Sequence, residues 1–165
     1  MTERRRMVSV RSISDDEWTR WRAMRLSALA EAPEAFSLTL EQWSGPQDTE
    51  RRWRERLVTV PFNLLAFLDG QPVGMASATA PASGEVELIS MWVSPDARGK
   101  GVGDALIEEI AVWARRQGAS RLVLAVRADN DPASALYARN GFVETGGSAH
   151  SDDRSAELDM VRILV

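Results

Sequence analysis

Cysteine is absent from this chain of 165 residues, and histidine occurs once, as His150. The missing cysteine excludes disulfides, a zinc–thiolate site and a cysteine nucleophile. A single histidine argues against a histidine-based metal site, and it leaves no Ser-His-Asp triad unless His150 itself serves. The stretch GGSAHSDD around His150 is typical of a solvated loop. We therefore expect no metal and no chemistry that depends on a cysteine thiol of the protein.

Long hydrophobic runs are also missing. The longest apolar stretch, VTVPFNLLAFL at 58–68, is interrupted by Pro61 and Asn63 and is well short of the ~20 residues that span a bilayer. The start, MTERRRMVSVRSISDDEW, has three arginines but no apolar segment after them, so no signal peptide is evident. These features predict a cytoplasmic protein that does not enter the membrane.

Lysine is nearly absent, because 19 of the 20 basic residues are arginine and only Lys100 is lysine. The 24 acidic residues bring the net charge to −4, which argues against nucleic acid as the main partner, since nucleic-acid binding usually needs a basic face. An acidic balance is compatible with a cationic acceptor. Lys100 stands out because it lies in the most glycine-rich stretch of the chain.

The pattern of apolar residues predicts an α/β domain with a mixed sheet. We expect one domain over residues 1–165, with residues 1–7 disordered. Predicted strands cover 8–14, 62–68, 72–80, 85–95, 121–126, 142–145 and 156–165, and predicted helices cover 17–32, 48–58, 101–117 and 131–140. Ser14 or Asp15, then Asp48 or Thr49, and finally Asp131 are the expected helix caps. The order of elements is therefore β-α-α-β-β-β-α-β-α-β-β.

The stretch SPDARGKGVGDAL at 94–106 joins an apolar strand to a helix, and it contains three glycines and two cations. The first backbone N–H groups of a helix lack internal partners, and the helix dipole places partial positive charge there. Glycine lets an anion approach this backbone closely. The stretch therefore indicates a phosphate site, with a flexible connection as the alternative.

Two nucleotide-binding motifs fit this stretch poorly. A P-loop requires GxxxxGK[ST], but here Lys100 precedes the last two glycines and no Ser or Thr follows it. A Rossmann fingerprint requires an acid at the end of the next strand, which instead ends in Val126-Arg127. A dinucleotide domain is therefore the least favoured alternative.

Arg98-Gly99-Lys100-Gly101-Val102-Gly103 resembles the R/Q-x-x-G-x-G/A signature of the GNAT superfamily of N-acetyltransferases. A second stretch, NDPASALYARNGF at 130–142, is similar to that family's N-x-x-A-x-x-L-Y-x-x-x-G-F motif at every defined position. The resemblance covers about residues 8–165. It implies a GNAT-like sheet of about seven strands, mostly antiparallel, with about four helices and a splay between the fourth and fifth strands.

The resemblance implies that acetyl-CoA is the cosubstrate and that its pyrophosphate binds at the glycine stretch. It places the pantetheine arm along a bulged fourth strand, where one backbone N–H serves as the oxyanion donor. The cofactor-binding residues that it implies are Met91, Trp92, Val93, Arg98, Gly99, Lys100, Gly101, Val102, Gly103, Asn130 and Ser134. Asn130 is equally typical of a turn residue before a helix.

Acetyl transfer to an amine needs a base, because an alkylammonium with a pKa near 10.4 is almost wholly protonated at neutral pH. By resemblance, Glu87 on the fourth predicted strand is the candidate base. Glu85 on the same face and a bound water are the alternatives. Tyr137, the only tyrosine, is by resemblance the candidate acid for the leaving thiolate, and packing in the core is its alternative.

The predicted activity is transfer of acetyl from acetyl-CoA to a primary amine by direct attack in a ternary complex, since there is no cysteine to form an acyl-enzyme. The alternative is an acyl-CoA-binding sensor with little turnover. A small-molecule amine, a peptide N-terminus or a side-chain amine all fit as acceptor, and a homodimer is compatible with the family.

An acceptor site near Phe36, Trp43, Trp53 and the turn at 147–153, with Glu31, Glu34 and Glu41 interleaved, would suit a cationic amine. The alternative is that these tryptophans pack in the core.

Overall fold

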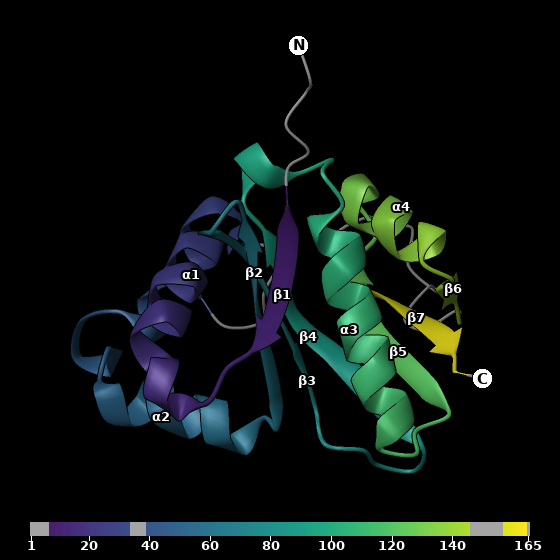
Figure 1. Cartoon of the computed structure of the whole chain (residues 1–165), viewed down its shortest axis with the longest axis horizontal. Helices are drawn as coiled ribbons and strands as arrows, with labels where there is room; N and C mark the ends of the chain where they lie inside the picture. Colours follow the sequence, from purple (N-terminus) through teal and green to yellow (C-terminus); the bar gives the residue numbers. More distant parts are fainter. Residues whose placement is uncertain (1–6, 34–38, 146–156, 165) are drawn as a thin grey trace.

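A computed structural model describes residues 7–33, 39–145 and 157–164. Its centre is a seven-stranded sheet in the order β1-β2-β3-β4-β5-β7-β6 (Figure 1). Neighbouring strands are antiparallel except for the parallel pair β4–β5. The strands are β1 Val8–Ser12, β2 Phe62–Leu68, β3 Gln71–Ala78, β4 Glu85–Val93, β5 Arg121–Arg127, β6 Val143–Glu144 and β7 Glu157–Ile163.

Four α-helices accompany this sheet: α1 Trp18–Glu31, α2 Glu50–Thr59, α3 Val102–Arg116 and α4 Asp131–Arg139. Ser14 caps a short 3₁₀ turn that leads into α1, and Thr49 caps α2 by accepting a hydrogen bond from the N–H of Arg52. The predicted cap of α4 is wrong by one residue. Asn130 caps this helix by accepting from the N–H of Ala133, so Asp131 and Pro132 occupy the first turn.

The two faces of the sheet bury separate hydrophobic clusters, because side chains alternate along each strand. Leu64, Ala76 and Leu88 pack in the cluster that contains α3 and Tyr137 of α4. Leu65, Met75 and Trp92 face the other way and pack with the buried residues of α1 and α2. Helices α3 and α4 therefore cover one face of the sheet and α1 and α2 the other (Figure 1).

Strand β4 carries a bulge near its middle. Ser77 of β3 pairs with Ile89, but Met75, two residues earlier, pairs with Trp92. Ala76 therefore lies opposite both Ser90 and Met91, and Ser90 takes the left-handed conformation with φ of 54°. The extra residue turns the end of β4 without ending its pairing to β3.

Strands β4 and β5 separate soon after they begin to pair. Their parallel register joins only Glu85, Val86 and Glu87 to Arg121, Leu122 and Val123, although β4 continues to Val93 and β5 to Arg127. The predicted fold class is thereby confirmed: a single α/β GNAT-like fold with a mostly antiparallel sheet that is splayed between the fourth and fifth strands.

Some expectations fall on residues that the structure does not describe. Phe36, Glu34, His150, the turn at 147–153 and most of the segment 1–7 lie outside the described residues. Met7 is described, and its N–H donates to the carboxylate of Asp69 at 3.0 Å. Within the described ranges, none of the helices has the length and apolar character that crossing a membrane requires.

Candidate active site

A cavity of about 470 Å³ lies where α3 begins, against the side of α4. Its walls come from the end of β4, the glycine loop, the first turn of α3 and the facing side of α4: Val93, Ala97, Arg98, Gly99, Gly101, Val102, Gly103, Asp104, Pro132, Leu136 and Arg139. No side chain caps the N-terminus of α3. Its first N–H groups therefore remain available to an anion.

The three glycines of the loop have different roles. Gly99 and Gly101 have φ of 76° and 83°, and a Cβ on either would meet nothing within 4 Å. They are glycines because of their backbone conformation and because they leave this corner open. Gly103 is helical, and a Cβ there would come 2.8 Å from Cδ2 of Leu136. Its missing side chain allows α3 to approach α4 closely.

The two cations of the stretch are engaged with the protein. Arg98 donates from Nε to the carbonyl of Val93 at 3.0 Å and from Nη2 to both carboxylate oxygens of Glu31, at 3.1 and 3.0 Å. Lys100 donates to the carbonyl of Asp96 at 2.7 Å and is exposed. Arg98 thus reaches the cavity, but its guanidinium already forms an ion pair.

Glu31 connects the end of α1 to this loop, which sequence reasoning did not foresee. Its carboxylate accepts from the indole Nε1 of Trp92 at 2.9 Å as well as from Arg98. Hydrogen bonding from Trp92 first, and then from Arg98, holds the pKa of Glu31 below its usual value. The sequence offers no signal for this contact, because the residues lie far apart along the chain and only the fold brings them together.

Arg139 is a second residue of the cavity that the sequence did not single out, since it occupies an undefined position of the second motif. It forms a two-pronged ion pair with Asp104, both contacts at 3.1 Å, and Asn140 donates to the same carboxylate at 2.8 Å. Hydrogen bonding by Arg139 lowers the pKa of Asp104. This pairing neutralises the one acid in the first turn of α3.

The other residues predicted to bind the cofactor belong to the end of β4 and to the start of α4. Met91 and Val93 pack against the α3 cluster, whereas Trp92 is buried on the opposite face. Asn130 uses its side-chain oxygen to cap α4. Ser134 is half-buried on the first turn of the same helix. Their contacts to a ligand remain predictions.

Tyr137 is buried in the α3 cluster. Its ring meets Phe142 edge to face, with centroids 5.7 Å apart. Burial raises the pKa of the Tyr137 phenol above its ordinary value, so the hydroxyl keeps its proton across the physiological range. The side chain thus has the packing role that sequence reasoning left open, and it also carries a proton that could be donated.

Glu87 lies on the face of the sheet opposite to α3. It lines a second cavity of about 470 Å³ together with Asp159, Thr145 and neighbouring residues of β5 and β7. Desolvation by burial, and then repulsion from Asp159 and Glu157, raise the pKa of the Glu87 carboxyl. A carboxylate with a raised pKa is better suited to accept a proton than an ordinary surface acid.

Glu85 differs from Glu87 although both line this cavity. Its carboxylate is paired with Arg121 at 3.0 Å. This ion pair commits Glu85 to holding β4 beside β5, and it favours Glu87 as the base. Glu87 lines this second cavity, and Val93 lines the cavity at the start of α3. The two residues are six positions apart on β4, which corresponds to about 20 Å along the strand at 3.3 Å per residue.

The tryptophans that were expected to line an acceptor site are buried in the core. Trp43 and Trp53 stack on each other with centroids 4.3 Å apart and are buried with α1 and α2. Glu41 is exposed, and Glu31 is paired with Arg98. The two tryptophans therefore serve the core, which was the alternative to lining an open cavity.

Comparison with known proteins agrees with this fold. Residues 13–142 match the acetyltransferase (GNAT) family, and the chain belongs to this family. The mycothiol acetyltransferase of Beutenbergia cavernae is 32% identical over 124 residues, which are 74% of this chain and 40% of that protein. The chain thus spans less than half the length of this relative.

Solved structures share the fold at lower identity. An acetyltransferase of the GNAT family from Streptococcus pneumoniae has a TM-score of 0.75 at 22% identity and covers 96% of this chain and 100% of its own. The PaiA N-acetyltransferase of Thermoplasma acidophilum, solved in complex with coenzyme A, has a TM-score of 0.72 at 19% identity and covers 95% and 99%.

Replacing Gly101 with Val tests the glycine loop. A β-branched residue at φ of 83° is strained by roughly 1–2 kcal/mol or more, so the loop should shift and the KM for acetyl-CoA should rise at least about 10-fold. Gly118→Val is the matched control, because Gly118 ends the same helix at φ of 81° with nothing near its Cβ position. Steady-state kinetics and thermal unfolding compare the two variants. An unchanged KM in Gly101→Val would contradict the phosphate assignment.

Proposed function

We propose that the protein is a cytoplasmic N-acetyltransferase that moves an acetyl group from acetyl-CoA to a primary amine by direct attack in a ternary complex. The observation that carries this proposal is the placement of two cavities along β4. One lies at the uncapped N-terminus of α3, and the other contains Glu87. Between them, β4 leaves β5 and offers its edge to a ligand.

The residues around the first cavity fit the phosphates of coenzyme A. Backbone N–H groups at Val102 and Gly103 lie at the positive end of the helix dipole, and Gly99 and Gly101 leave the approach open. Arg139 neutralises Asp104, which would otherwise repel an anion. The arm of the coenzyme would follow the backbone of Met91 to Val93. When bound, acetyl-CoA supplies the activated acyl group.

The protein's own groups would then move two protons. Glu87 accepts one proton from the ammonium of the acceptor, so that the amine nitrogen can attack the carbonyl carbon of the thioester. A backbone N–H at the bulge of β4 donates to the carbonyl oxygen as negative charge develops there. Tyr137 donates its phenol proton to the sulfur as the carbon–sulfur bond breaks. The attacking nitrogen loses its second proton as the adduct collapses to the amide; this proton restores the phenol through solvent, and the proton held by Glu87 leaves to bulk solvent.

An amine-panel assay tests this proposal. Protein is incubated with acetyl-CoA and a broad panel of primary amines and peptides, thiol release is followed, and acetylated products are identified by mass. We expect amine-dependent thiol release with a mass increase of one acetyl group on at least one acceptor. Saturable binding of acetyl-CoA without amine-dependent release across the panel would overturn the enzymatic proposal in favour of the sensor. Sizing of the protein in the same buffer tests whether it forms a homodimer.

A further inference from the structure

Two arginines lie on the inner side of α1 and α2, the helices that cover the face of the sheet on which Glu87 lies. Arg25 of α1 is buried, with 7% of its surface exposed. Arg56 of α2 is half-buried, and its guanidinium lies 5.2 Å from the ring centre of Trp21. Burial lowers the pKa of each arginine to about 10, and in Arg56 the positive charge of Arg25 contributes as well. The two cations are therefore close enough to repel each other.

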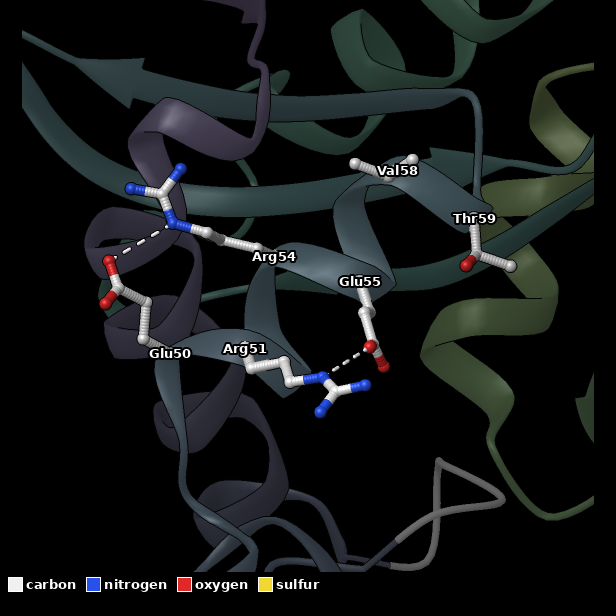
Figure 2. A pocket seen from close by; sticks show the side chains of 6 residues that line it. All are labelled: Glu50, Arg51, Arg54, Glu55, Val58 and Thr59. Atoms are coloured by element: carbon white, nitrogen blue, oxygen red, sulfur yellow. Dashed lines mark hydrogen bonds and ion pairs between the residues drawn. The ribbon is translucent and has the colours of Figure 1, made fainter.

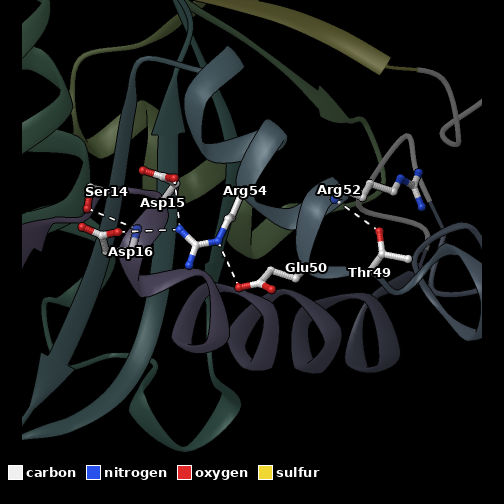
Figure 3. A network of polar contacts seen from close by, with 7 residues as sticks. All are labelled: Ser14, Asp15, Asp16, Thr49, Glu50, Arg52 and Arg54. Carbon is white, nitrogen blue, oxygen red and sulfur yellow. Dashed lines mark hydrogen bonds and ion pairs between the residues drawn. The ribbon is translucent and has the colours of Figure 1, made fainter.

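The other arginines of α2 behave differently. Arg51 pairs with Glu55 on the outer face of the helix, beside the shallow hollow drawn in Figure 2. Arg54 pairs with Glu50 and with Asp15 before α1, as Figure 3 shows. Arg52 donates to the carbonyl of Gln42 and lies over the ring of Trp43. Ion pairs thus account for Arg51 and Arg54, whereas Arg52 is held by a carbonyl and an aromatic ring.

Arg56 is held by neutral groups. It donates to the Oδ1 atom of Asn63 at 3.0 Å, to the hydroxyl of Ser77 at 3.2 Å and to the hydroxyl of Ser90 at 3.0 Å. Within the described ranges, no carboxylate lies at ion-pair distance from Arg56. These bonds use three of the five N–H donors of a guanidinium, and they fix its position without neutralising its charge.

This cluster shares a face of the sheet with the candidate base. Asn63 and Ser77 are opposite each other on β2 and β3, and Thr79 follows two residues later on the same face. Thr79 accepts from the N–H of Glu87 at 2.9 Å. Ser90, which contacts Arg56, lies three residues beyond Glu87 on β4, about 10 Å at 3.3 Å per residue. The Arg56 guanidinium and the Glu87 carboxylate thus flank one stretch of the bulged strand.

The two ends of this stretch have opposite charge. Asp159 and Glu157 lie close enough to Glu87 for their negative charge to raise the pKa of its carboxyl, so this group of carboxylates favours a nearby ammonium. A partly buried guanidinium without a carboxylate is costly, and an anionic ligand would offset that cost with charge-assisted hydrogen bonds. Such a site matches a molecule that carries an amine at one end and an anion at the other.

We propose that Arg56, supported by Arg25, binds an anionic group of the acceptor, a carboxylate or a phosphate, while the amine of the same molecule lies beside Glu87. This inference rests on the proposed acetyltransferase function and narrows its substrate class. It replaces the cationic acceptor that the acidic composition suggested with a small amino compound of mixed charge.

Matched acceptors test this inference on the unmodified protein. The acid arm contains α-amino acids and ω-amino acids of increasing length, each compared with its own carboxamide, and the phosphate arm compares O-phosphoethanolamine with ethanolamine. We expect the anionic member to have a kcat/KM at least about 10-fold higher than its neutral partner for the best chain length, which corresponds to one charge-assisted hydrogen bond. The arm with the larger ratio identifies the anion.

Substitutions test whether the preference for anionic acceptors comes from Arg56 and Arg25. Arg56→Gln and Arg25→Gln should each reduce the anionic-to-neutral ratio toward one, with the KM for acetyl-CoA unchanged. Arg51→Gln removes a cation from the outer face of the same helix and should keep the ratio. If a variant fails to fold, the anionic-to-neutral ratio of kcat/KM in the wild type still tests the inference.

Acetylation of the neutral partners as fast as, or faster than, the anionic ones would overturn this inference and leave the acetyltransferase proposal intact. Acetyl-CoA binding without acetylation of any amine would overturn both.

Discussion

Replacing Glu87 with Gln is expected to lower kcat about 100-fold near neutral pH, at the lower end of the range for loss of a general base. The amide cannot accept the ammonium proton, so the reaction must use the small fraction of acceptor that is already neutral. That fraction grows about tenfold per pH unit below the amine pKa near 10.4. The variant should therefore recover activity as the pH rises, and pH–rate profiles of kcat measure this.

The charges around Glu87 determine how the activity of the wild type should depend on pH. Burial and the carboxylates of Asp159 and Glu157 raise its pKa, and the base works only when it is deprotonated. The activity should therefore rise with pH, and the midpoint of this rise should lie above the ordinary pKa of a glutamate. Asp159→Asn removes part of the repulsion, lowers the pKa of Glu87 and should move this midpoint to lower pH.

Glu85→Gln is the matched control, because Glu85 lies two residues away, lines the same cavity and is paired with Arg121. We expect its kcat and the shape of its pH profile to resemble those of the wild type. A wild-type profile in Glu87→Gln, or the loss of this rise with pH in Glu85→Gln instead, would assign the base to another group or to water.

Tyr137→Phe is expected to lower kcat by a similar factor of about 100, with little change in the KM for acetyl-CoA. The leaving thiolate would lose its proton donor, while the ring that packs against Phe142 is kept. Since burial raises the pKa of Tyr137, the phenol stays protonated below pH 10. The loss should therefore be the same at every pH in that range.

Thermal unfolding separates this effect from a loss of packing. Tyr137→Phe should unfold close to the wild-type temperature, because only a hydroxyl is removed. Phe142→Leu disturbs the same ring pair and should lower the unfolding temperature, but it should leave kcat nearly unchanged once the protein is folded. A wild-type kcat in Tyr137→Phe would make this tyrosine structural only.

Much of the fold was predictable because local signals agree with the final structure. Asp69-Gly70 marks the turn between β2 and β3, and Thr49 marks the start of α2. The cap of α4 was displaced by one residue because Asn and Asp stand side by side and both are good caps. The exact ends of β1 and β7 were less predictable, since pairing with a neighbouring strand decides where a strand ends.

The candidate site was predictable only in part. The motif positions place Gly101 and Leu136 at one cavity, and Glu87 was selected by its place on β4. Arg25 and Arg56 gave no such signal, because Arg56 looks the same in the sequence as Arg51 and Arg54, its ion-paired neighbours on α2. Glu31 suggested an acidic acceptor site, but in the fold it binds Arg98 and Trp92.

The sequence by itself determined the order of the elements, the absence of cysteine chemistry and the glycine-rich start of α3, because each of these depends on residues that are neighbours along the chain. Only the tertiary structure decided that Arg56 has no carboxylate partner among the described residues, where β4 leaves β5 and which face Glu87 shares with Arg56. The physical reason is that pairing, desolvation and repulsion depend on distance in space, and packing of α1 and α2 against the sheet sets those distances.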